Sequence, residues 1–211
     1  DQTFLFLPLA HVFARILVNS VIAVGNTMTF FRGMETLVDD FQIVRPHFFS
    51  SVPRIFEKVY SKVISGAEAK GGAALKIFNW AKGVGSEVSE LIIAKKNIPF
   101  MLGLKYKVAT KLVFSKVQGA LGGRVRFCIS GAAPLNPEIA KFFHGAGVLV
   151  LEGLGMSENT SVTNVNRPDN YKFGYVGQPV EGVEQKIAED GEICFRGGNI
   201  MQEYYKMPEK T

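Results

Sequence analysis

The stretch VLVLEGLGMSE, Val148–Glu158, joins a short apolar run to a glycine-rich segment that carries a hydroxyl and a carboxylate. The continuous apolar run Val148–Leu151 is typical of a strand in the middle of a parallel sheet, because both faces of such a strand are covered. The segment Glu152–Glu158 then leaves the sheet at the carboxyl end of that strand. Ligands of open α/β sheets bind at these strand ends, so this stretch predicts one edge of a binding site.

A second loop of unusual composition lies upstream. SGAAPL, Ser130–Leu135, follows a run of alternating apolar residues, Arg124–Ser130, and precedes a helix start marked by Asn136 and Pro137. Small residues allow a flat ligand to lie against the backbone, but a tight strand-to-helix turn also requires them. The motif alone does not separate these two interpretations.

The rest of the chain alternates strands with helices, which predicts an α/β fold with a mostly parallel sheet flanked by helices. We expect further strands at Phe4–Leu7, Thr27–Phe31 and His47–Ser50, and helices at His11–Val24, Glu35–Val44 and from Pro53 with Ser51 as its cap. Residues 66–116 break this rhythm with two or three lysine-rich helices. The last third lacks helical patterns and predicts a small antiparallel β subdomain. We therefore divide the chain into residues 1–170 and 171–211.

Composition is that of a globular protein with a core, since 47% of the 211 residues are hydrophobic and 20% are charged. No apolar run reaches the ~18 residues that a membrane span needs, and no signal peptide is recognisable. Cys128 and Cys194 lie in predicted strands and are expected to be buried free thiols of a cytoplasmic protein. With two cysteines and three scattered histidines, a zinc site is not expected.

The net charge of +5 is unevenly distributed. Residues 54–126 contain 14 Lys and Arg but only 4 Asp and Glu. Such a block can be a solvated helical face, or it can face phosphate groups or an anionic membrane. No nucleic-acid-binding motif accompanies it, and aromatic residues are not interleaved with the basic ones, so nucleic acid is not expected as a partner.

The segment after the central strand has the groups that a metal–phosphate ligand needs. Gly153 and Gly155 permit close approach of the backbone. Ser157 offers a hydroxyl to a phosphate oxygen, and Glu158 offers a carboxylate to Mg²⁺, which takes one or two protein carboxylates together with substrate phosphates. The alternative is a glycine-rich turn with a surface glutamate. Because SGAAPL follows the neighbouring strand, the two loops together favour a nucleotide site.

Six segments in a fixed order then carry a family resemblance: LPLAHVF, VPRIFEK, SGAAPL, EGLGMSE, GYVGQPVEGVEQKI and GEICFRGGNIMQEYYK. This order resembles the adenylate-forming (AMP-binding) superfamily, and in particular its long-chain fatty acyl-CoA synthetases. The resemblance runs from Leu7 almost to the end of the chain. It implies that the chain is an internal fragment of the N-terminal domain and that residues 66–116 are the helical insertion of long-chain members.

The resemblance implies an ATP-dependent acid–thiol ligase. Such an enzyme activates a fatty acid with ATP and Mg²⁺ to an acyl-adenylate, then transfers the acyl group to coenzyme A. Two alternatives stay open: a fatty acyl-AMP ligase or other adenylation domain with a different acceptor, and a non-catalytic nucleotide- or acyl-binding module. The basic region is expected to face either an anionic membrane, to which the protein would bind peripherally, or the phosphates of coenzyme A.

Individual roles follow from the matched motifs. The residues that match the two sides of the adenine site are Gly131, Ala132, Ala133, Glu152, Gly153 and Leu154. Ser157 matches the residue that contacts the α-phosphate, and Glu158 matches the Mg²⁺ ligand. His11 matches a histidine near the reacting carboxylate and the pantetheine exit, whereas His47 and His144 match no motif and are expected to be structural.

The chain also departs from the family pattern. Leu154 stands where the family usually has an aromatic residue stacked on adenine, a loss of ~0.5–1.5 kcal/mol by analogy with aromatic pairs. Three parts of the family's site have no counterpart in these 211 residues: the phosphate loop, the aspartate that binds the ribose, and the C-terminal domain with its lysine. We therefore expect that the 211 residues alone do not form an acyl-adenylate.

Overall fold

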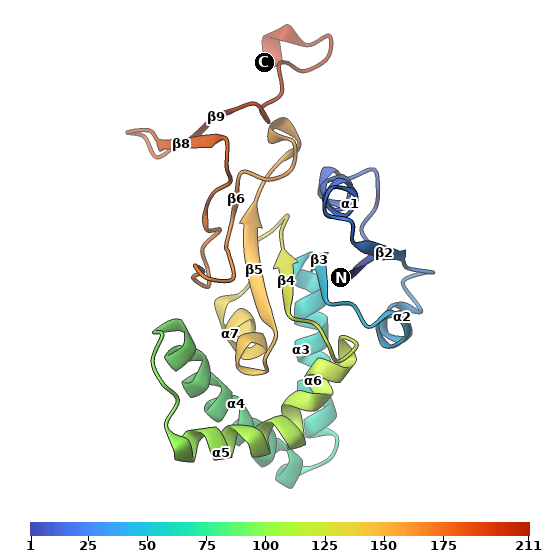
Figure 1. The fold of residues 1–211 in the computed structure, drawn as a ribbon, viewed down its shortest axis with the longest axis vertical. Helices are drawn as coiled ribbons and strands as arrows, with labels where there is room; N and C mark the ends of the chain where they lie inside the picture. The colour runs from blue at the N-terminus through green and yellow to red at the C-terminus, as the bar shows by residue number, and fades with distance from the viewer.

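A computed structural model describes all residues 1–211 and places a seven-stranded sheet at the centre of the molecule (Figure 1). The strand order is β2-β1-β3-β4-β5-β6-β7. The strands are β1 (Gln2–Leu5), β2 (Thr27–Phe30), β3 (Phe48–Ser51), β4 (Phe127–Ser130), β5 (Leu149–Leu154), β6 (Asn164–Val165) and β7 (Gln178–Pro179). All pairings from β2 to β5 are parallel, and β6 and β7 are antiparallel to their neighbours. The predicted fold class is confirmed.

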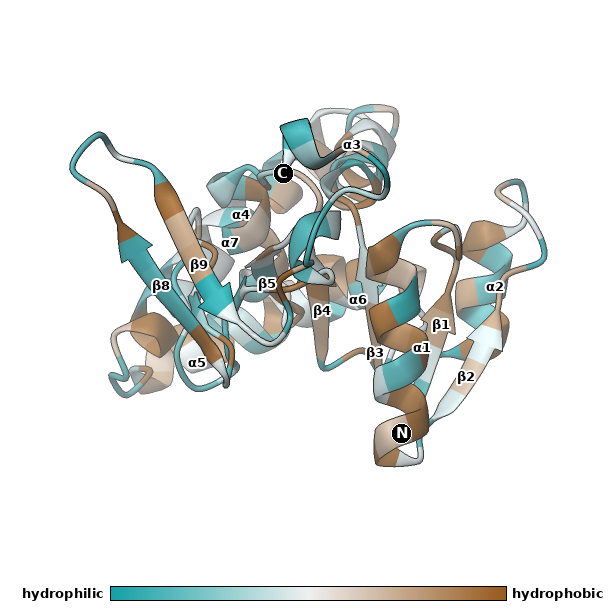
Figure 2. Ribbon diagram, turned by 90° about the horizontal axis from the view of Figure 1, so that it is seen from above, coloured by the Kyte–Doolittle hydropathy of each residue, from teal (hydrophilic) through white to brown (hydrophobic).

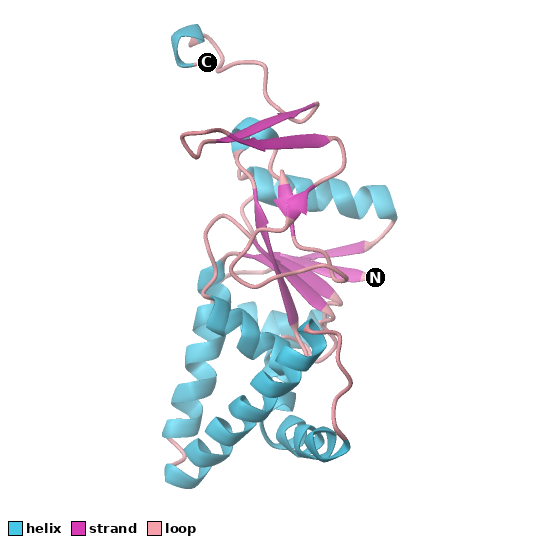
Figure 3. Ribbon diagram, turned by 90° about the vertical axis from the view of Figure 1, so that its left-hand side faces the viewer, coloured by secondary structure: helices cyan, strands magenta, loops and turns pink.

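Most of the helices lie at one end of the molecule. The helices are α1 (Val12–Val24), α2 (Leu37–Val44), α3 (Pro53–Glu68), α4 (Gly72–Ile93), α5 (Phe100–Ala109), α6 (Ser115–Ala120) and α7 (Pro137–Gly145), with a π-helical turn, Thr110–Phe114, between α5 and α6. Helices α3 to α7 gather at one end of the molecule, whereas α1 stands apart from them (Figures 1 and 3). No helix is both long and apolar enough to cross a membrane.

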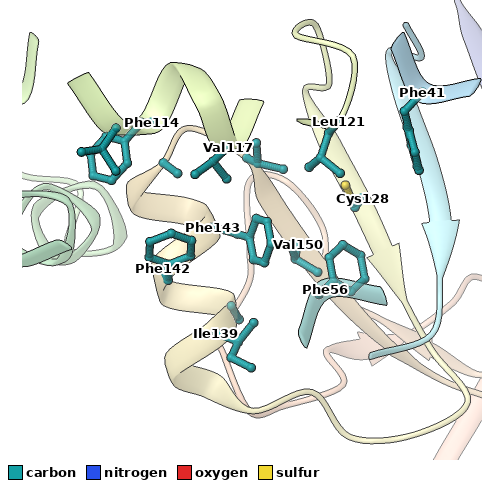
Figure 4. Close-up of a cluster of buried hydrophobic side chains, with 14 of the residues drawn as sticks. Phe41, Phe56, Phe114, Val117, Leu121, Cys128, Ile139, Phe142, Phe143 and Val150 are labelled. Carbon is teal, nitrogen blue, oxygen red and sulfur yellow. The ribbon is translucent and has the colours of Figure 1, made fainter. Parts of the chain in front are cut away.

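The core lies between the sheet and the helices, and nine of its 26 buried residues are phenylalanine (Figure 4). Phe49 of β3 stacks on Phe56 of α3 at 5.9 Å, and Phe56 meets the edge of Phe143 of α7 at 5.7 Å between ring centroids. All three side chains are fully buried. Each aromatic pair adds about 0.5–1.5 kcal/mol beyond the area that it buries, so this ladder fixes α3 and α7 against the sheet.

Two predicted helix starts have different outcomes. Asn136 caps α7 as expected, because its Oδ1 accepts a hydrogen bond from the Glu138 N–H at 2.9 Å and Pro137 occupies the first position. The predicted cap at Ser51 is wrong, although Pro53 does begin α3. Ser51 is the last residue of β3, where it pairs with Ser130, and Val52 occupies the cap position without a side-chain bond.

The last third folds into short strands, including the ribbon β8 (Val183–Ile187) and β9 (Ile193–Gly197), which forms a separate two-stranded antiparallel sheet. Cys128 is buried, and its burial raises the pKa of the thiol well above its ordinary value. The expected burial of Cys194 is wrong, because this ribbon leaves it exposed. The division of the chain after residue 170, and the bounds 66–116 of the helical insertion, stay predictions.

Candidate functional site

The pairing of β4 with β5 brings the two glycine-containing loops together. The strands run parallel, with Ser130 opposite Glu152, so both loops leave the sheet at the same edge. A cavity of ≈ 460 Å³ lies there, between these loops and α1. Of the nine predicted site residues, seven line this cavity: His11, Gly131, Ala132, Gly153, Leu154, Ser157 and Glu158. Ala133 and Glu152 do not.

One wall of the cavity is the side of α1 that carries Phe13, Ile16 and Leu17. Figure 2 shows that α1 carries both hydrophobic and hydrophilic residues along its length, as expected for a helix with one side exposed to solvent. Further apolar side chains of the lining come from β4 and from the chain after Glu158, including Ile129 and Val162. The lining of the cavity is therefore mainly apolar, and Ser157, Glu158 and His11 are among its polar residues.

His11 begins α1 and caps it with its own side chain. Its Nδ1 accepts a hydrogen bond from the Phe13 N–H at 3.1 Å. A neutral imidazole has one donor and one acceptor nitrogen, so the bond to Nδ1 places the proton on Nε2. His11 thus offers a hydrogen-bond donor at the cavity, next to Phe13.

The backbone at Gly155 and Ala132 has little freedom to change. A Cβ atom at Gly155 would overlap the carbonyl oxygen of Ser161, so only glycine fits at this close approach of two backbone segments. Ala132 has φ +69°, a left-handed conformation that costs a non-glycine residue about 1–2 kcal/mol. Strain of this kind persists where surrounding structure imposes it, and it is common at ligand sites.

Glu152 acts as a buried brace in this structure. Its Oε1 accepts a hydrogen bond from the Leu135 N–H at 3.1 Å, and its Oε2 accepts one from the Gly174 N–H at 2.9 Å. The side chain is buried, and both carboxylate oxygens are engaged. It therefore holds the loop Ser130–Leu135 against the segment around Gly174 and does not reach the cavity.

Glu158 has a partner that the sequence reasoning missed. The Tyr204 hydroxyl donates a hydrogen bond to Glu158 Oε1 at 2.6 Å, although the two residues are 46 positions apart. This bond is the main reason why the pKa of Glu158 lies below its ordinary value of 4.5. A backbone hydrogen bond from Glu158 itself lowers this pKa further, and Tyr204 contacts only the Oε1 atom of the carboxylate. The signal for Tyr204 was the aromatic pair in QEYYK, whose position relative to Glu158 depends on the fold.

The other two histidines are structural, as their lack of motif suggested. His144 is buried in α7, where Nδ1 lies 2.7 Å from the Ser89 hydroxyl of α4 and Nε2 lies 2.8 Å from the Tyr171 hydroxyl. Burial lowers the pKa of His144 to about 4. His47 Nδ1 accepts a hydrogen bond from the Gln2 N–H at 3.0 Å, which joins β1 to the residue before β3.

Comparison with known proteins identifies the family. A family model described as AMP-binding enzyme matches residues 1–205. The chain belongs to this family. Among its curated relatives, fatty acyl-CoA synthetase A of Dictyostelium discoideum is 35% identical to this chain over 222 residues. Long-chain-fatty-acid–CoA ligase 5 of Mus musculus is 36% identical over 225 residues. The alignments cover 98% and 100% of the chain but 32% and 31% of these relatives, so the chain spans about a third of their length.

Solved structures share the fold of this AMP-binding enzyme chain. The N-terminal domain of FACL13 from Mycobacterium tuberculosis is similar with a TM-score of 0.63 and 16% identity, over 100% of this chain and 44% of that one. The adenylation domain of a carboxylate reductase from Mycobacterium chelonae gives 0.64 and 22% identity, over 99% and 29%. The resemblance inferred from six motifs is therefore confirmed at the level of family and fold.

Proposed function

We propose that this chain forms part of a long-chain fatty acid–CoA ligase, in which a fatty acid and ATP yield an acyl-adenylate and pyrophosphate before the acyl group passes to coenzyme A. The observation that carries the proposal is the cavity between α1 and the two loops. Its apolar side chains suit a hydrocarbon chain, and its polar groups suit a carboxylate and a phosphate. The names of the relatives support this choice of substrate.

Adenine is proposed to lie against the backbone of Gly131 and Ala132 on one side and Gly153 and Leu154 on the other. These residues line the cavity from neighbouring strands. Glu152 and Ala133 were predicted to touch the base as well. Because the Glu152 carboxylate is fully engaged elsewhere, we propose that Glu152 positions the two loops and does not contact the nucleotide.

Ser157 and Glu158 are proposed to meet the phosphates. No group of three or more His, Cys, Asp or Glu side chains in the structure could hold a metal by itself. That fits Mg²⁺, which binds through one or two carboxylates together with substrate phosphates. Glu158 is the residue that would hold it, through the oxygen that Tyr204 leaves free. When bound, Mg²⁺ would neutralise charge on the phosphates.

The chain's own residues would act by positioning, because attack of a carboxylate on phosphorus needs little acid–base assistance. His11 lines the cavity, and its Nε2–H is a hydrogen-bond donor suited to a carboxylate oxygen there. Ser157 would donate its hydroxyl to an oxygen of the α-phosphate. The close approach of Gly155 to Ser161 fixes the segment that carries Ser157 and Glu158.

Titration calorimetry with a non-hydrolysable acyl-adenylate analogue tests the proposal on this chain. We expect the hexadecanoyl analogue to bind at least tenfold more tightly than the acetyl analogue, because the longer chain buries more apolar surface. Ile16→Asp in the apolar wall should remove this difference, whereas Ile43→Asp on the exposed side of α2 should preserve it. Equal affinity for the two analogues would contradict a fatty acyl substrate.

The alternatives differ in measurable ways. A different acceptor leaves these binding results unchanged and is detected by supplying thiols other than coenzyme A to the whole enzyme. A non-catalytic nucleotide module would bind AMP and the acyl analogues equally. Leu154 is the feature that favours this last candidate, because it cannot stack on adenine as an aromatic ring does.

We also propose peripheral contact with an anionic membrane as a second interaction. The excess of Lys and Arg in residues 54–126 supports it. The same excess could instead face the phosphates of coenzyme A.

A further inference from the structure

The outer side of α5 is apolar, although it faces solvent. Four exposed apolar side chains share it: Phe100, Met101, Leu104 and Val108, which are 78%, 63%, 42% and 50% exposed. The inner side of the same helix is also apolar, with Leu102 and Ala109 buried in the core. A surface helix in water normally turns a polar side outward, so this side of α5 indicates a surface with a partner.

Lysines border the apolar side of α5. At ~3.6 residues per turn, the four apolar side chains fall within about 100° of arc, and Lys107 and Lys105 lie just beyond its two edges. Both lysines are exposed. Long lysine side chains can place their charge at an interface while their stems lie along apolar surface. An apolar strip with lysine on both sides is the pattern of a helix that lies in the plane of a membrane interface.

The charge around α5 is not compensated by acidic residues. No Asp or Glu occurs between Glu90 and Glu138, while the same segment holds six lysines and two arginines. Glu90 itself is paired with Lys141 on α7 at 2.6 Å. A protein partner for an apolar strip need not be acidic, but the uncompensated lysines favour an anionic surface. The apolar strip in turn argues against free coenzyme A, whose phosphates would not cover it.

The place of α5 in the fold allows contact with a flat surface. The helix lies at the edge of the molecule, at the end opposite the β8–β9 ribbon and the C-terminus (Figures 1 and 3). The cavity lies at the carboxyl ends of β4 and β5, and no α5 residue lines it. A membrane could therefore meet α5 without covering the cavity between α1 and the loops.

We infer that α5 docks on an anionic phospholipid surface, with Phe100, Met101, Leu104 and Val108 entering the interface and the neighbouring lysines contacting headgroups. This inference rests on the membrane contact proposed above but not on the ligase reaction. Phe100 and Met101 stand at the start of the helix, a few residues after Lys95 and Lys96.

Co-sedimentation with vesicles tests the inference, using neutral phosphatidylcholine vesicles and vesicles containing phosphatidylserine. We expect binding to the anionic vesicles and at least tenfold weaker binding to the neutral ones. Lys105→Glu with Lys107→Glu should weaken anionic binding by at least about 20-fold, since each lysine contributes about fivefold. The matched control, Lys186→Glu with Lys210→Glu, changes the net charge equally at the other end of the molecule and should bind severalfold more tightly than the α5 variant.

A second variant tests the apolar strip. Phe100→Ser with Met101→Ser should weaken binding about tenfold or more, whereas Ile43→Ser on α2, which is also exposed, should have no effect. Circular dichroism and thermal unfolding verify that each variant is folded, which is expected because the substituted side chains face solvent. The indole introduced by Phe100→Trp, in a Trp80→Phe background, should be quenched by brominated lipid.

Three results would overturn the inference. If the anionic vesicles bind but the α5 variants bind equally well, α5 is not the docking element, although the membrane contact stands. If neither vesicle binds the chain, both proposals fail, and the ligase proposal is untouched because calorimetry measures it separately. If α5 variants turn a dimer into a monomer in sedimentation velocity without any change in lipid binding, the apolar strip belongs to a second copy of the chain.

Discussion

Protonation of His144 should destabilise the fold as the pH falls. Burial between α4 and α7 lowers the pKa of His144 from its ordinary 6.5 to about 4. Below pH 6.5 the His144 imidazole is therefore protonated in the unfolded chain, whereas in the folded chain it is protonated only near pH 4. The contribution of neutral His144 to the free energy of unfolding is fully present above pH 6.5 and is lost as the pH falls from 6.5 to about 4. At about 1.4 kcal/mol for each pH unit of difference, the loss is about 3 kcal/mol.

Urea unfolding followed by circular dichroism between pH 7 and pH 4 measures this loss. Other groups also titrate in this range, so the informative quantity is the difference between the wild type and His144→Gln, in which those groups remain. The free energy of unfolding of the wild type should fall by about 3 kcal/mol more than that of the variant. Equal pH dependence in the two proteins would show that His144 is not the group that causes the loss.

Tyr171→Phe separates burial from hydrogen bonding as the cause. It removes the hydroxyl that lies 2.8 Å from His144 Nε2 while leaving the ring in place. Loss of one buried hydrogen bond should cost about 1–3 kcal/mol at every pH. The slope with pH should be preserved, because burial is the cause of the lowered pKa. If the free energy of unfolding of Tyr171→Phe did not depend on pH in this way, the hydrogen bond and not burial would be the cause of the lowered pKa of His144.

Four further substitutions follow from the geometry. Gly155→Ala should cost at least about 3 kcal/mol in urea unfolding, because its Cβ overlaps a facing carbonyl; a cost below about 1 kcal/mol would contradict the close approach. Ala132→Gly should add about 1 kcal/mol of stability by relieving a left-handed residue, and destabilisation would oppose that view. Phe143→Ala should cost about 3–5 kcal/mol, measured in the same way; a loss near zero would mean that the ring does not pack as described. Tyr204→Phe should raise the pKa of Glu158 toward 4.5, read from carboxyl ¹³C shifts during titration, and an unchanged pKa would exclude the hydrogen bond.

The sequence predicted the parallel sheet well, because both of its main signals are local. The apolar run before Glu152 and the helix start at Asn136–Pro137 depend on residues within a few positions of each other. The Ser51 cap failed because a serine before Pro53 reads equally well as the end of a strand. The burial of Cys194 failed because alternation in a strand does not tell whether anything covers its faces.

The site was predicted in part for the same reason. Motif order grouped Ser157 and Glu158 with the loop Ser130–Leu135, and the pairing of β4 with β5 explains why these two loops, 22 positions apart, meet at one cavity. The bond from Tyr204 to Glu158 and the two bonds of Glu152 could not be predicted, because they join residues that only the tertiary fold brings together. A buried carboxylate next to a glycine looks the same in sequence whether it faces a ligand or the protein.

The segment that follows Asn170 links the helical end of the molecule to the cavity. The Tyr171 hydroxyl lies 2.8 Å from His144 Nε2, and three residues later the Gly174 N–H donates to Glu152. The same Glu152 carboxylate accepts from the Leu135 N–H at the end of the loop Ser130–Leu135. The segment Tyr171–Gly174 is thus held at one end by the buried imidazole of His144 and at the other end by the carboxylate of Glu152. The geometry of the cavity therefore depends on groups outside its lining, because the loop that contributes Gly131 and Ala132 is held at Leu135 by Glu152.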